Sequence, residues 1–282
     1  MIGIIGGTGL YSMEGLTQLE EKKIQTPFGQ PSAPLVLGKY ESEKVAFLPR
    51  HGIHHELLPS EINYLANIWA LKSVGVERVL SVSAVGSLTE EIRPGDLAVP
   101  SQYLDFTKGK RVHTFFGDGL VAHISTAEPT CLSLSRKIKS IAESLDVQVH
   151  IGKTYACVEG PRLGNKAESH FFRKSECHLV GMTNVPEVYL AREAGLCYCT
   201  ISVVTDYDCW LEDPAQHAST EQIISRYKLN LQKVQKILKQ IITSPQESQT
   251  CQCRQALEGA VLTPESCLSV EKKSLLKFLK NA

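Results

Sequence analysis

Residues Val79 to Val85 form an unbroken run of apolar and small side chains, which constrains the fold more than any other segment. A strand without a polar face must be covered on both sides, as is typical of a central strand in an α/β sheet. Further apolar segments alternate with segments of helical period. The expected strands include residues 2–5, 147–158 and 196–204, and the expected helices include residues 131–145, 166–174 and 220–242. Another helix is expected to begin at Ser60, a good N-cap residue. The alternation predicts an α/β fold in which helices cover a buried sheet.

The composition indicates one folded domain of ordinary charge. The 282 residues are enough for one large domain or two small ones. No linker-like stretch interrupts the alternation, so we expect a single domain over residues 1–282, with residues 245–282 as a helical tail. Lys and Arg together number 30, as do Asp and Glu. This balance argues against nucleic acid or an acidic membrane surface as the main partner.

The ends of the chain and its cysteines predict a cytoplasmic protein. The N-terminus lacks a basic segment before its short apolar stretch, so we expect no signal peptide. No apolar run approaches the roughly 20 residues needed to cross a bilayer, so we expect no membrane span. Most of the nine cysteines lie singly in apolar stretches, as Cys157, Cys197 and Cys199 do, which is typical of buried free thiols.

Cys251 and Cys253 are different, because they lie two residues apart in a polar stretch. With no second pair at the spacing of metal ligands, a zinc site is disfavoured. Two interpretations remain: two reduced surface thiols, or a reversible local disulfide.

A glycine-rich turn follows the first apolar segment. Gly6, Gly7 and Gly9 remove side chains from the turn, and its N–H groups together with the Thr8 hydroxyl could hold an anion. The glycines could equally serve only to make a tight turn. The spacing is not G-x-G-x-x-G, and no P-loop motif occurs in the chain.

A basic loop follows the apolar segment that ends at Pro49. It contains Arg50 and His51, and two further histidines follow at positions 54 and 55. It is either a solvated loop or an anion site, since arginine forms forked hydrogen bonds to phosphate oxygens. Metal binding by His54 and His55 is disfavoured, because no carboxylate or cysteine follows at ligand spacing.

Polar side chains stand at the ends of several predicted strands. If the strands lie side by side, these groups converge on one crevice, where α/β sheets bind their ligands. Hydroxyl groups, N–H groups, an arginine and a histidine suit a phosphate dianion. The residues concerned are Thr8, Arg50, His51, Ser83, Ala84, Thr183, Asp206 and Asp208.

The two aspartates indicate proton transfer. Residues two apart in an extended chain face the same way, about 6–7 Å apart. Repulsion between the carboxylates of Asp206 and Asp208 should raise one pKa, and a carboxyl group that stays protonated can donate a proton to a leaving group. The alternative is a solvated loop or a helix cap, although burial against Trp210 disfavours it.

The chain resembles the 5′-methylthioadenosine phosphorylases of the trimeric purine nucleoside phosphorylase family. The most specific match is Val204–Trp210, which contains both aspartates. The match extends from residue 1 to about residue 242 and includes the segments Ile2–Leu10, Thr26–Gly29, Arg50–Gly52, Asn63–Lys72, Glu159–Arg162, Val185–Glu187 and Ala191–Gly195.

The resemblance implies a three-layer αβα fold with a central mixed sheet, and a homotrimer. It also implies that inorganic phosphate attacks C1′ of methylthioadenosine and releases adenine and 5-methylthioribose 1-phosphate. Neither a metal nor an organic cofactor is implied. The cleavage passes through an oxocarbenium-like state, which needs an anion on one side of the sugar and an acid on the other.

The resemblance also implies roles for individual residues. Asp206 would stabilise the leaving purine at N7, and Asp208 would help to read its amino group. Met182 would lie against the ribose. Phosphate would be held by Thr8, Arg50, His51, Ser83, Ala84 and Thr183. The methylthio pocket would be formed by His123, Thr220, Ile223 and Ile224, closed by a neighbouring subunit.

Three positions depart from the adenine-reading pattern. Leu163 and Gly164 stand where Phe and Ser are usual, and Gly181 replaces an Asn. They leave phosphorolysis of 6-oxopurine nucleosides or methylthioinosine as an alternative. His217 could favour a 5′-hydroxyl group or could be a solvated loop residue. A nicotinamide-dependent oxidoreductase is a remote alternative, because Glu20 and Glu21 come too early for the ribose-binding acid of that fold.

Overall fold

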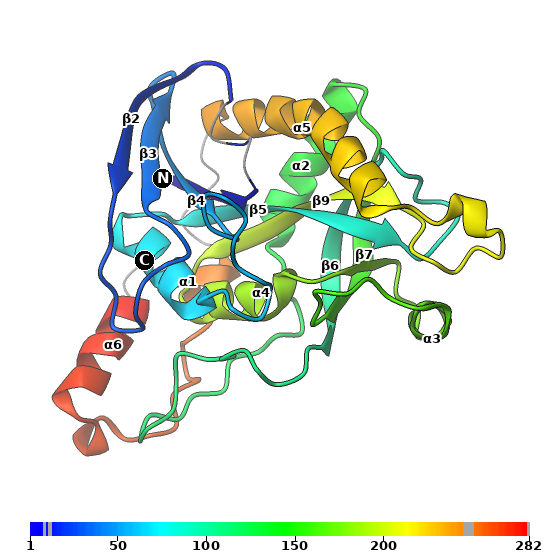
Figure 1. The fold of residues 1–282 in the computed structure, drawn as a ribbon. Coiled ribbons are helices and arrows are strands. Elements are labelled where there is room, and N and C mark those ends of the chain that lie inside the picture. Colours follow the sequence, from blue (N-terminus) through cyan, green and yellow to red (C-terminus); the bar gives the residue numbers. More distant parts are fainter. Residues whose placement is uncertain (8–9, 11–12, 245–250, 281–282) are drawn as a thin grey trace.

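The computed structural model describes residues 1–7, 10, 13–244 and 251–280, and Figure 1 shows its fold. Its nine strands form one mixed sheet in the order β2-β3-β4-β1-β5-β8-β7-β6-β9. Strand β9 also pairs with β5, so five of the strands close on themselves. The strands are β1 (Ile2–Gly6), β2 (Leu16–Lys22), β3 (Leu35–Tyr40), β4 (Glu43–Pro49), β5 (Arg78–Ser87), β6 (Leu97–Phe106), β7 (Val149–Val158), β8 (Leu179–Gly181) and β9 (Cys197–Asp206).

Helices cover both faces of the sheet, which confirms the predicted fold class. In Figure 1, α2 and α5 lie on one side of β5 and β9, and α1 and α4 lie on the other. Helix α3 lies at the far end beside β7. Helix α6 packs on α1, where Phe278 stacks on Trp69 with ring centroids 3.6 Å apart. The helices are α1 (Tyr64–Ser73), α2 (Leu132–Ser144), α3 (Lys166–Lys174), α4 (Asn184–Glu193), α5 (Thr220–Thr243) and α6 (Val270–Lys280).

Successive side chains of a strand point to opposite faces of the sheet, which explains why the core lies on both faces. Ile4 and Ile5 are both fully buried but point to opposite faces of β1. Ile4 packs in the cluster that contains Leu231 and Val234 of α5, whereas Ile5 packs in the cluster that contains Ile68 of α1. Each helical layer thus has its own apolar core, and the sheet separates them.

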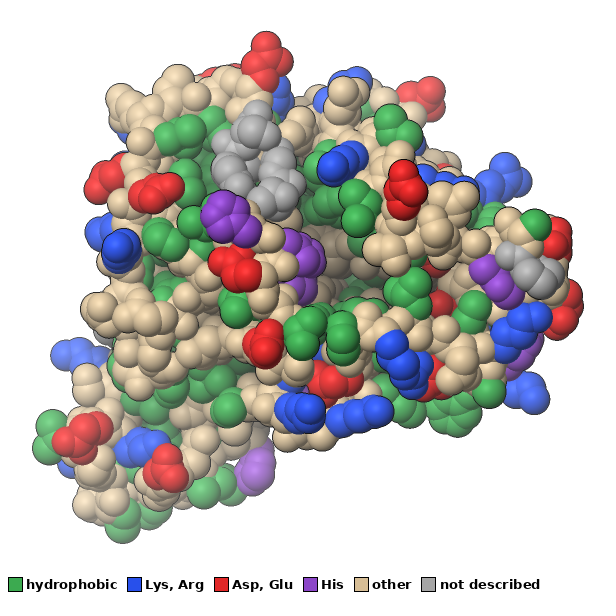
Figure 2. Space-filling model, in the orientation of Figure 1, with side chains coloured by type: hydrophobic (Ala, Val, Ile, Leu, Met, Phe, Trp, Pro, Cys, Tyr) green, Lys and Arg blue, Asp and Glu red, His purple; other side chains and the backbone are tan. Residues whose placement is uncertain are grey.

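Parallel pairing brings the ends of four strands to one edge of the sheet. Strand β1 lies between β4 and β5, with Gly6 opposite Pro49 and Ile5 opposite Ser81, and β9 runs parallel to β5. The groups that follow these strands therefore share one edge. Figure 2 shows a recess in the middle of this face, with histidine side chains at its rim.

No helix in the described part of the chain is long and apolar enough to cross a membrane.

Candidate active site

Asp206 is the last residue of β9, and its carboxyl group is buried. Only 6% of the residue is exposed. Oδ2 accepts a hydrogen bond from the Thr205 hydroxyl at 2.7 Å, and Oδ1 accepts one from the Asp208 N–H at 2.7 Å. Burial is the main cause that raises the pKa of Asp206, and the charge of Asp208 adds a smaller effect. Repulsion was the cause expected from the sequence, but desolvation contributes more.

Asp208 lies directly beside Asp206, against two glycines. A Cβ atom on Gly86 would lie 3.1 Å from Asp206 Oδ1 and 3.2 Å from Asp208 Cβ. On the other side, a Cβ atom on Gly164 would lie 3.5 Å from Asp208 Oδ1. The backbone of Asp208 has a φ of 53°, a conformation that aspartate tolerates better than most residues. Gly86 and Gly164 therefore make the room that the aspartate pair occupies.

Arg50 is buried, and its guanidinium group is almost fully hydrogen-bonded within the protein. Nε and Nη2 bind the two carboxylate oxygens of Glu187 at 2.7 and 3.0 Å. Nη2 also donates to the Ser81 hydroxyl at 2.6 Å, and Nη1 donates to the Val82 carbonyl at 3.0 Å. An arginine has five N–H donors, so one on Nη1 has no partner within the described part of the chain and can serve a ligand.

His51 presents one ring nitrogen to the protein and one to the site. Its Nδ1 lies 2.9 Å from the carbonyl oxygen of Leu57, so this nitrogen must carry a proton to make the bond. Burial and then the charge of Arg50 lower the pKa of His51 to about 4. The ring stacks on His55 with centroids 4.3 Å apart. In the neutral ring, the lone pair is therefore on Nε2, which can accept a hydrogen bond.

Thr183 provides the clearest vacant donor at the site. It is the N-cap residue of α4 and is 7% exposed, yet its hydroxyl has no hydrogen-bond partner among the described residues. A buried hydroxyl without a partner costs free energy, so a ligand at this position would satisfy it. Val185 has non-helical backbone angles (φ −109°, ψ 128°), so the regular turns of α4 begin after it.

Ser83 and Ala84 lie next to this helix N-terminus on β5. The Ser83 hydroxyl is 3.5 Å from Asn184 Oδ1, which follows Thr183. Ala84 is exposed although every residue from 79 to 83 is buried. The small side chain at this position leaves the backbone open to a ligand. Thr8, the other predicted phosphate residue, lies outside the described residues.

The backbone of Gly160 holds the predicted ribose residue, Met182, and Tyr155 packs against the residue before it. A Cβ atom on Gly160 would lie 2.5 Å from the sulfur of Met182, so the backbone of Gly160 packs directly on this side chain. One residue earlier, a Cβ atom on Gly181 would overlap the hydroxyl of Tyr155. Tyr155 is fully buried, and its hydroxyl accepts a hydrogen bond from Thr183 N at 3.5 Å. Tyr155 thus occupies the space of a side chain at position 181.

Leu163 is half exposed on the loop that approaches Asp208. The loop is held by Arg162, whose guanidinium group pairs with Glu168 at the start of α3. An aliphatic side chain here offers a purine an apolar contact, but no aromatic ring for stacking.

Of the four residues predicted to form the methylthio pocket, three lie together in this structure and one does not. Thr220, Ile223 and Ile224 lie in the first turns of α5, where Ile224 is 48% exposed. His123 lies elsewhere: its N–H donates to the Ala260 carbonyl in the C-terminal tail at 2.9 Å. Figure 1 shows the segment around residue 123 beside that tail, away from the start of α5. His217 lies 2.8 Å from the Leu211 carbonyl, so one ring nitrogen serves its own loop.

Two functional neighbours were not predicted from the sequence. Glu187 holds Arg50, as described above. Tyr227 of α5 lies over the glycine turn, where a Cβ atom on Gly7 would be 3.8 Å from its hydroxyl. The only available signal for Glu187 was a carboxylate among the apolar residues at the start of α4, a position that requires a partner when buried.

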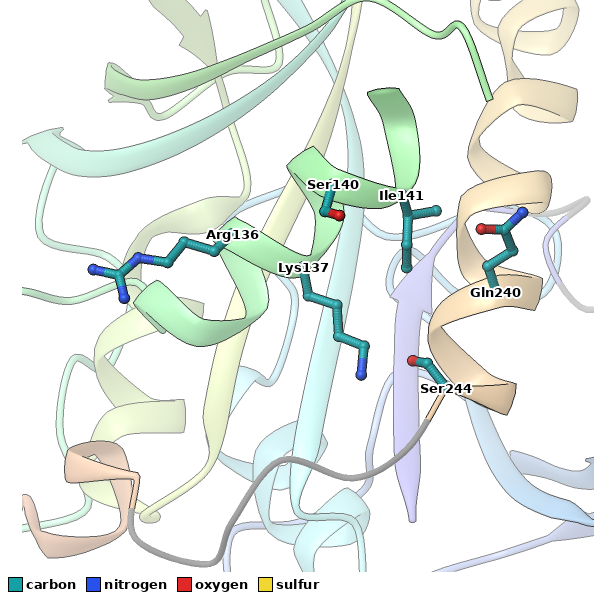
Figure 3. A pocket seen from close by; sticks show the side chains of 6 residues that line it. All are labelled: Arg136, Lys137, Ser140, Ile141, Gln240 and Ser244. Atoms are coloured by element: carbon teal, nitrogen blue, oxygen red, sulfur yellow. The ribbon is translucent and has the colours of Figure 1, made fainter. Parts of the chain in front are cut away.

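Two further features lie outside this edge of the sheet. A shallow pocket between α2 and α5 is lined by none of the predicted site residues (Figure 3); its lining is Arg136, Lys137, Ser140, Ile141, Gln240 and Ser244.

The prediction that Cys251 and Cys253 are surface thiols is wrong for Cys253, which is buried. The reason is that the polar stretch folds back onto the apolar start of β9.

Comparison with known proteins identifies the family. The family model of the phosphorylase superfamily matches residues 1–243. S-methyl-5′-thioadenosine phosphorylase of Geobacter sulfurreducens is 43% identical over 279 residues, which cover 99% of this chain and 97% of the relative. The Pyrococcus furiosus protein of the same name is 49% identical over 257 residues, covering 91% of this chain and 97% of the relative.

Solved structures agree with these relatives. A methylthioadenosine phosphorylase from an Antarctic soil metagenomic library superposes with a TM-score of 0.92 at 44% identity, covering 99% of this chain and 98% of that one. The Schistosoma mansoni methylthioadenosine phosphorylase, solved in complex with adenine, has a TM-score of 0.81 at 35% identity, covering 86% and 90% of the two chains. With the buried aspartate at the end of β9 and the vacant hydroxyl at the start of α4, the chain belongs to the phosphorylase superfamily, among the S-methyl-5′-thioadenosine phosphorylases.

Proposed function

We propose that this protein cleaves S-methyl-5′-thioadenosine by phosphorolysis, giving adenine and 5-methylthioribose 1-phosphate. The observation that carries the proposal is the buried carboxyl group of Asp206, whose pKa is raised at the end of a strand that faces the recess. A phosphate oxygen bonds to C1′, and the bond from C1′ to the purine breaks. The electron pair of that bond goes to the purine. The carboxyl group of Asp206 donates the proton that the purine then needs.

The phosphate is held on the opposite side of the sugar. The N–H of Arg50 that has no partner among the described residues, the Nε2 atom of His51 and the hydroxyl of Thr183 would bind this one anion, together with the predicted residues Ser83, Ala84 and Thr8. Inorganic phosphate is the co-substrate, and the reaction uses neither a metal nor an organic cofactor. Met182 packs against the ribose, and Asp208 accepts a hydrogen bond from the amino group of adenine.

The active unit is a homotrimer in the cytoplasm. The argument for assembly is the position of His123. Its segment packs on the C-terminal tail, whereas Thr220 and Ile223, with which it was predicted to form the methylthio pocket, lie at the start of α5. A second copy of the chain can supply the missing wall of the methylthio pocket. Val121 and Leu262 support this, because they are joined by a backbone hydrogen bond and both are exposed apolar residues beside His123.

A second candidate substrate is methylthioinosine or another 6-oxopurine nucleoside. The observation that favours it is Gly181, because Tyr155 fills the space where an Asn side chain could bind the base. The absence of an aromatic ring at Leu163 favours it as well. Asp208 favours adenine, because a carboxylate accepts from an amino group and repels a 6-oxo group.

The test is base release followed by chromatography, with methylthioadenosine, methylthioinosine and adenosine as substrates, each with and without inorganic phosphate. We expect phosphate-dependent release of adenine, fastest from methylthioadenosine. Faster release from methylthioinosine would replace the adenine assignment by the second candidate. No release from any of the three nucleosides would overturn the proposed reaction.

A further inference from the structure

Four cysteines from distant parts of the chain meet at one point. They are Cys131, which precedes α2, Cys197 at the start of β9, and Cys251 and Cys253 in the C-terminal tail. All four sulfur atoms lie within 4.8 Å of one another, and all four are free thiols. Three of the four residues are buried, and Cys251 is half buried.

The distance between two of the sulfur atoms is close to that in a tetrahedral metal site. With zinc–sulfur bonds of about 2.3 Å, two sulfurs on one zinc ion lie roughly 3.8 Å apart. The sulfurs of Cys131 and Cys251 are 3.7 Å apart. A disulfide would need about 2.0 Å between its sulfurs. A four-iron cluster would hold its cysteines around a cube, at larger separations than these.

Neighbouring groups fit the charge of such a site. Four thiolates around one Zn²⁺ carry a net charge of −2. Arg192 Nη1 lies 3.8 Å from the sulfur of Cys253, and Arg254 is the next residue of the chain after Cys253. Arg192 is fixed by the Ser125 carbonyl at 2.8 Å, and Arg254 by Glu77 at 2.7 Å. Two positively charged groups are thus held beside the sulfurs, as the outer shell of a thiolate site requires.

The four ligands are also held by ordered backbone. Cys131 N donates to the Tyr198 carbonyl at 2.8 Å, which joins the start of α2 to β9. Arg254 N donates to the Cys251 carbonyl at 3.0 Å in the short 3₁₀ helix Gln252–Gln255. The cysteines are therefore positioned before any ion enters.

We propose that Cys131, Cys197, Cys251 and Cys253 bind one structural Zn²⁺ ion that fastens the C-terminal tail to the sheet. Soft thiolate ligands in tetrahedral order select zinc, and a closed set of four leaves no position for catalysis. Cys197 and Asp206 stand at opposite ends of β9, about 30 Å apart for an extended strand of this length. The site is thus separate from the proposed chemistry.

The test measures zinc in the full chain purified under reducing conditions without chelator. We expect about one zinc per chain by mass spectrometry of the metal. Cys253→Ser and Cys251→Ser should each lower the zinc content at least tenfold and lower the melting temperature. The matched control is Cys267→Ser, because Cys267 is exposed in the same tail and belongs to no cluster. It should keep the zinc.

Cobalt provides a readout that does not depend on the folding of a variant. Co²⁺ added to the metal-free wild-type chain should give the intense absorption of a tetrahedral tetrathiolate site, and one equivalent of Zn²⁺ should abolish it. A wild-type chain that contains less than about a tenth of an equivalent of zinc and gives no such spectrum would overturn the proposal. So would two disulfides among the four cysteines, found by peptide mapping of the unreduced native protein.

Discussion

Arg50 and Glu187 form a forked ion pair in the interior of the protein, with Nε of the arginine 2.7 Å from Oε2 of the glutamate. Glu187 also accepts hydrogen bonds from the hydroxyls of Ser81 and Tyr198, at 2.9 and 2.7 Å. Burial alone would lower the pKa of Arg50, but the Glu187 carboxylate raises it above its ordinary value. The carboxylate of Glu187 therefore keeps Arg50 protonated at the proposed phosphate site, within a pair that has no net charge.

Glu187→Ala should strongly destabilise the protein, because it leaves the charge of Arg50 buried without a partner. We expect a loss of about 3–5 kcal/mol in the free energy of unfolding, measured by denaturant titration at constant protein concentration. The control is Glu143→Ala, which removes an exposed pair with Lys139 at 3.7 Å and should cost about 0.5 kcal/mol or less. Equal losses in the two variants would contradict a structural role for the pair.

Asp206→Asn should lower kcat/KM for methylthioadenosine by about 10²–10⁴-fold, because the amide cannot transfer a proton to the purine. It should also shift the preference towards methylthioinosine, since the amide can donate a hydrogen bond to a hypoxanthine-type base. Rates with both nucleosides at saturating phosphate measure the two effects. The matched control is Asp146→Asn, on an exposed turn after α2. An unchanged ratio of the two substrates in Asp206→Asn would count against the role of Asp206 at the base.

Thr183→Val should have opposite effects on stability and on phosphate binding. The hydroxyl has no partner among the residues that the structure describes, so removing it should raise the free energy of unfolding by about 1 kcal/mol. The KM for phosphate should rise about tenfold, because a hydrogen bond to a charged ligand is lost. Initial rates at varied phosphate and thermal unfolding measure both.

Ser169→Ala is the control for this variant, because Ser169 of α3 is also a buried hydroxyl without a partner among the described residues. The Ser169→Ala protein should gain a similar free energy of unfolding, and its KM for phosphate should be unchanged. A normal KM in Thr183→Val would remove Thr183 from the phosphate site.

Glu193 should make the protein less stable as the pH rises towards neutrality. Burial raises the pKa of this carboxyl group to about 7, although it accepts hydrogen bonds from Phe115 N and the Thr114 hydroxyl. Because the folded state binds the proton more tightly, the free energy of unfolding should fall from about pH 5 to pH 7, by on the order of 3 kcal/mol.

Glu193→Gln should remove this fall, because the amide stays neutral. Denaturant titrations from pH 5 to pH 8 compare the variant with the wild type, and Glu143→Gln on the exposed face of α2 serves as the control. A wild-type stability that is flat across this range would show that Glu193 does not titrate there.

The helices with strong end signals could be predicted closely from the sequence. The helix expected over residues 166–174 is α3, and the long helix expected from Thr220 is α5; both begin with capping boxes, formed by Asn165 with Glu168 and by Ser219 with Gln222. The start of α1 was predicted at Ser60 but lies after Asn63, whose side chain accepts a hydrogen bond from Ala66 N at 3.1 Å. Both residues are good N-caps, so local sequence could not choose between them.

Features that depend on contacts between distant segments could not be predicted. Strand β2 is exposed along almost its whole length and pairs only with β3, so its sequence has no apolar alternation. The groups at the strand ends were predicted because each follows an apolar run. The partner of Arg50 lies 137 positions away, and the four cysteines come from three separate segments. No spacing rule within one segment can detect such sets.

The packing of Tyr155 against Gly181 has a consequence for any redesign of this protein. A Cβ atom at position 181 would lie 2.1 Å from the hydroxyl oxygen of Tyr155, so an asparagine there requires the tyrosine to move or to be replaced by a smaller residue. Replacing Tyr155 in turn removes the hydroxyl group that accepts a hydrogen bond from Thr183 N. A change of side chain beside the predicted ribose residue therefore reaches the predicted phosphate residue as well.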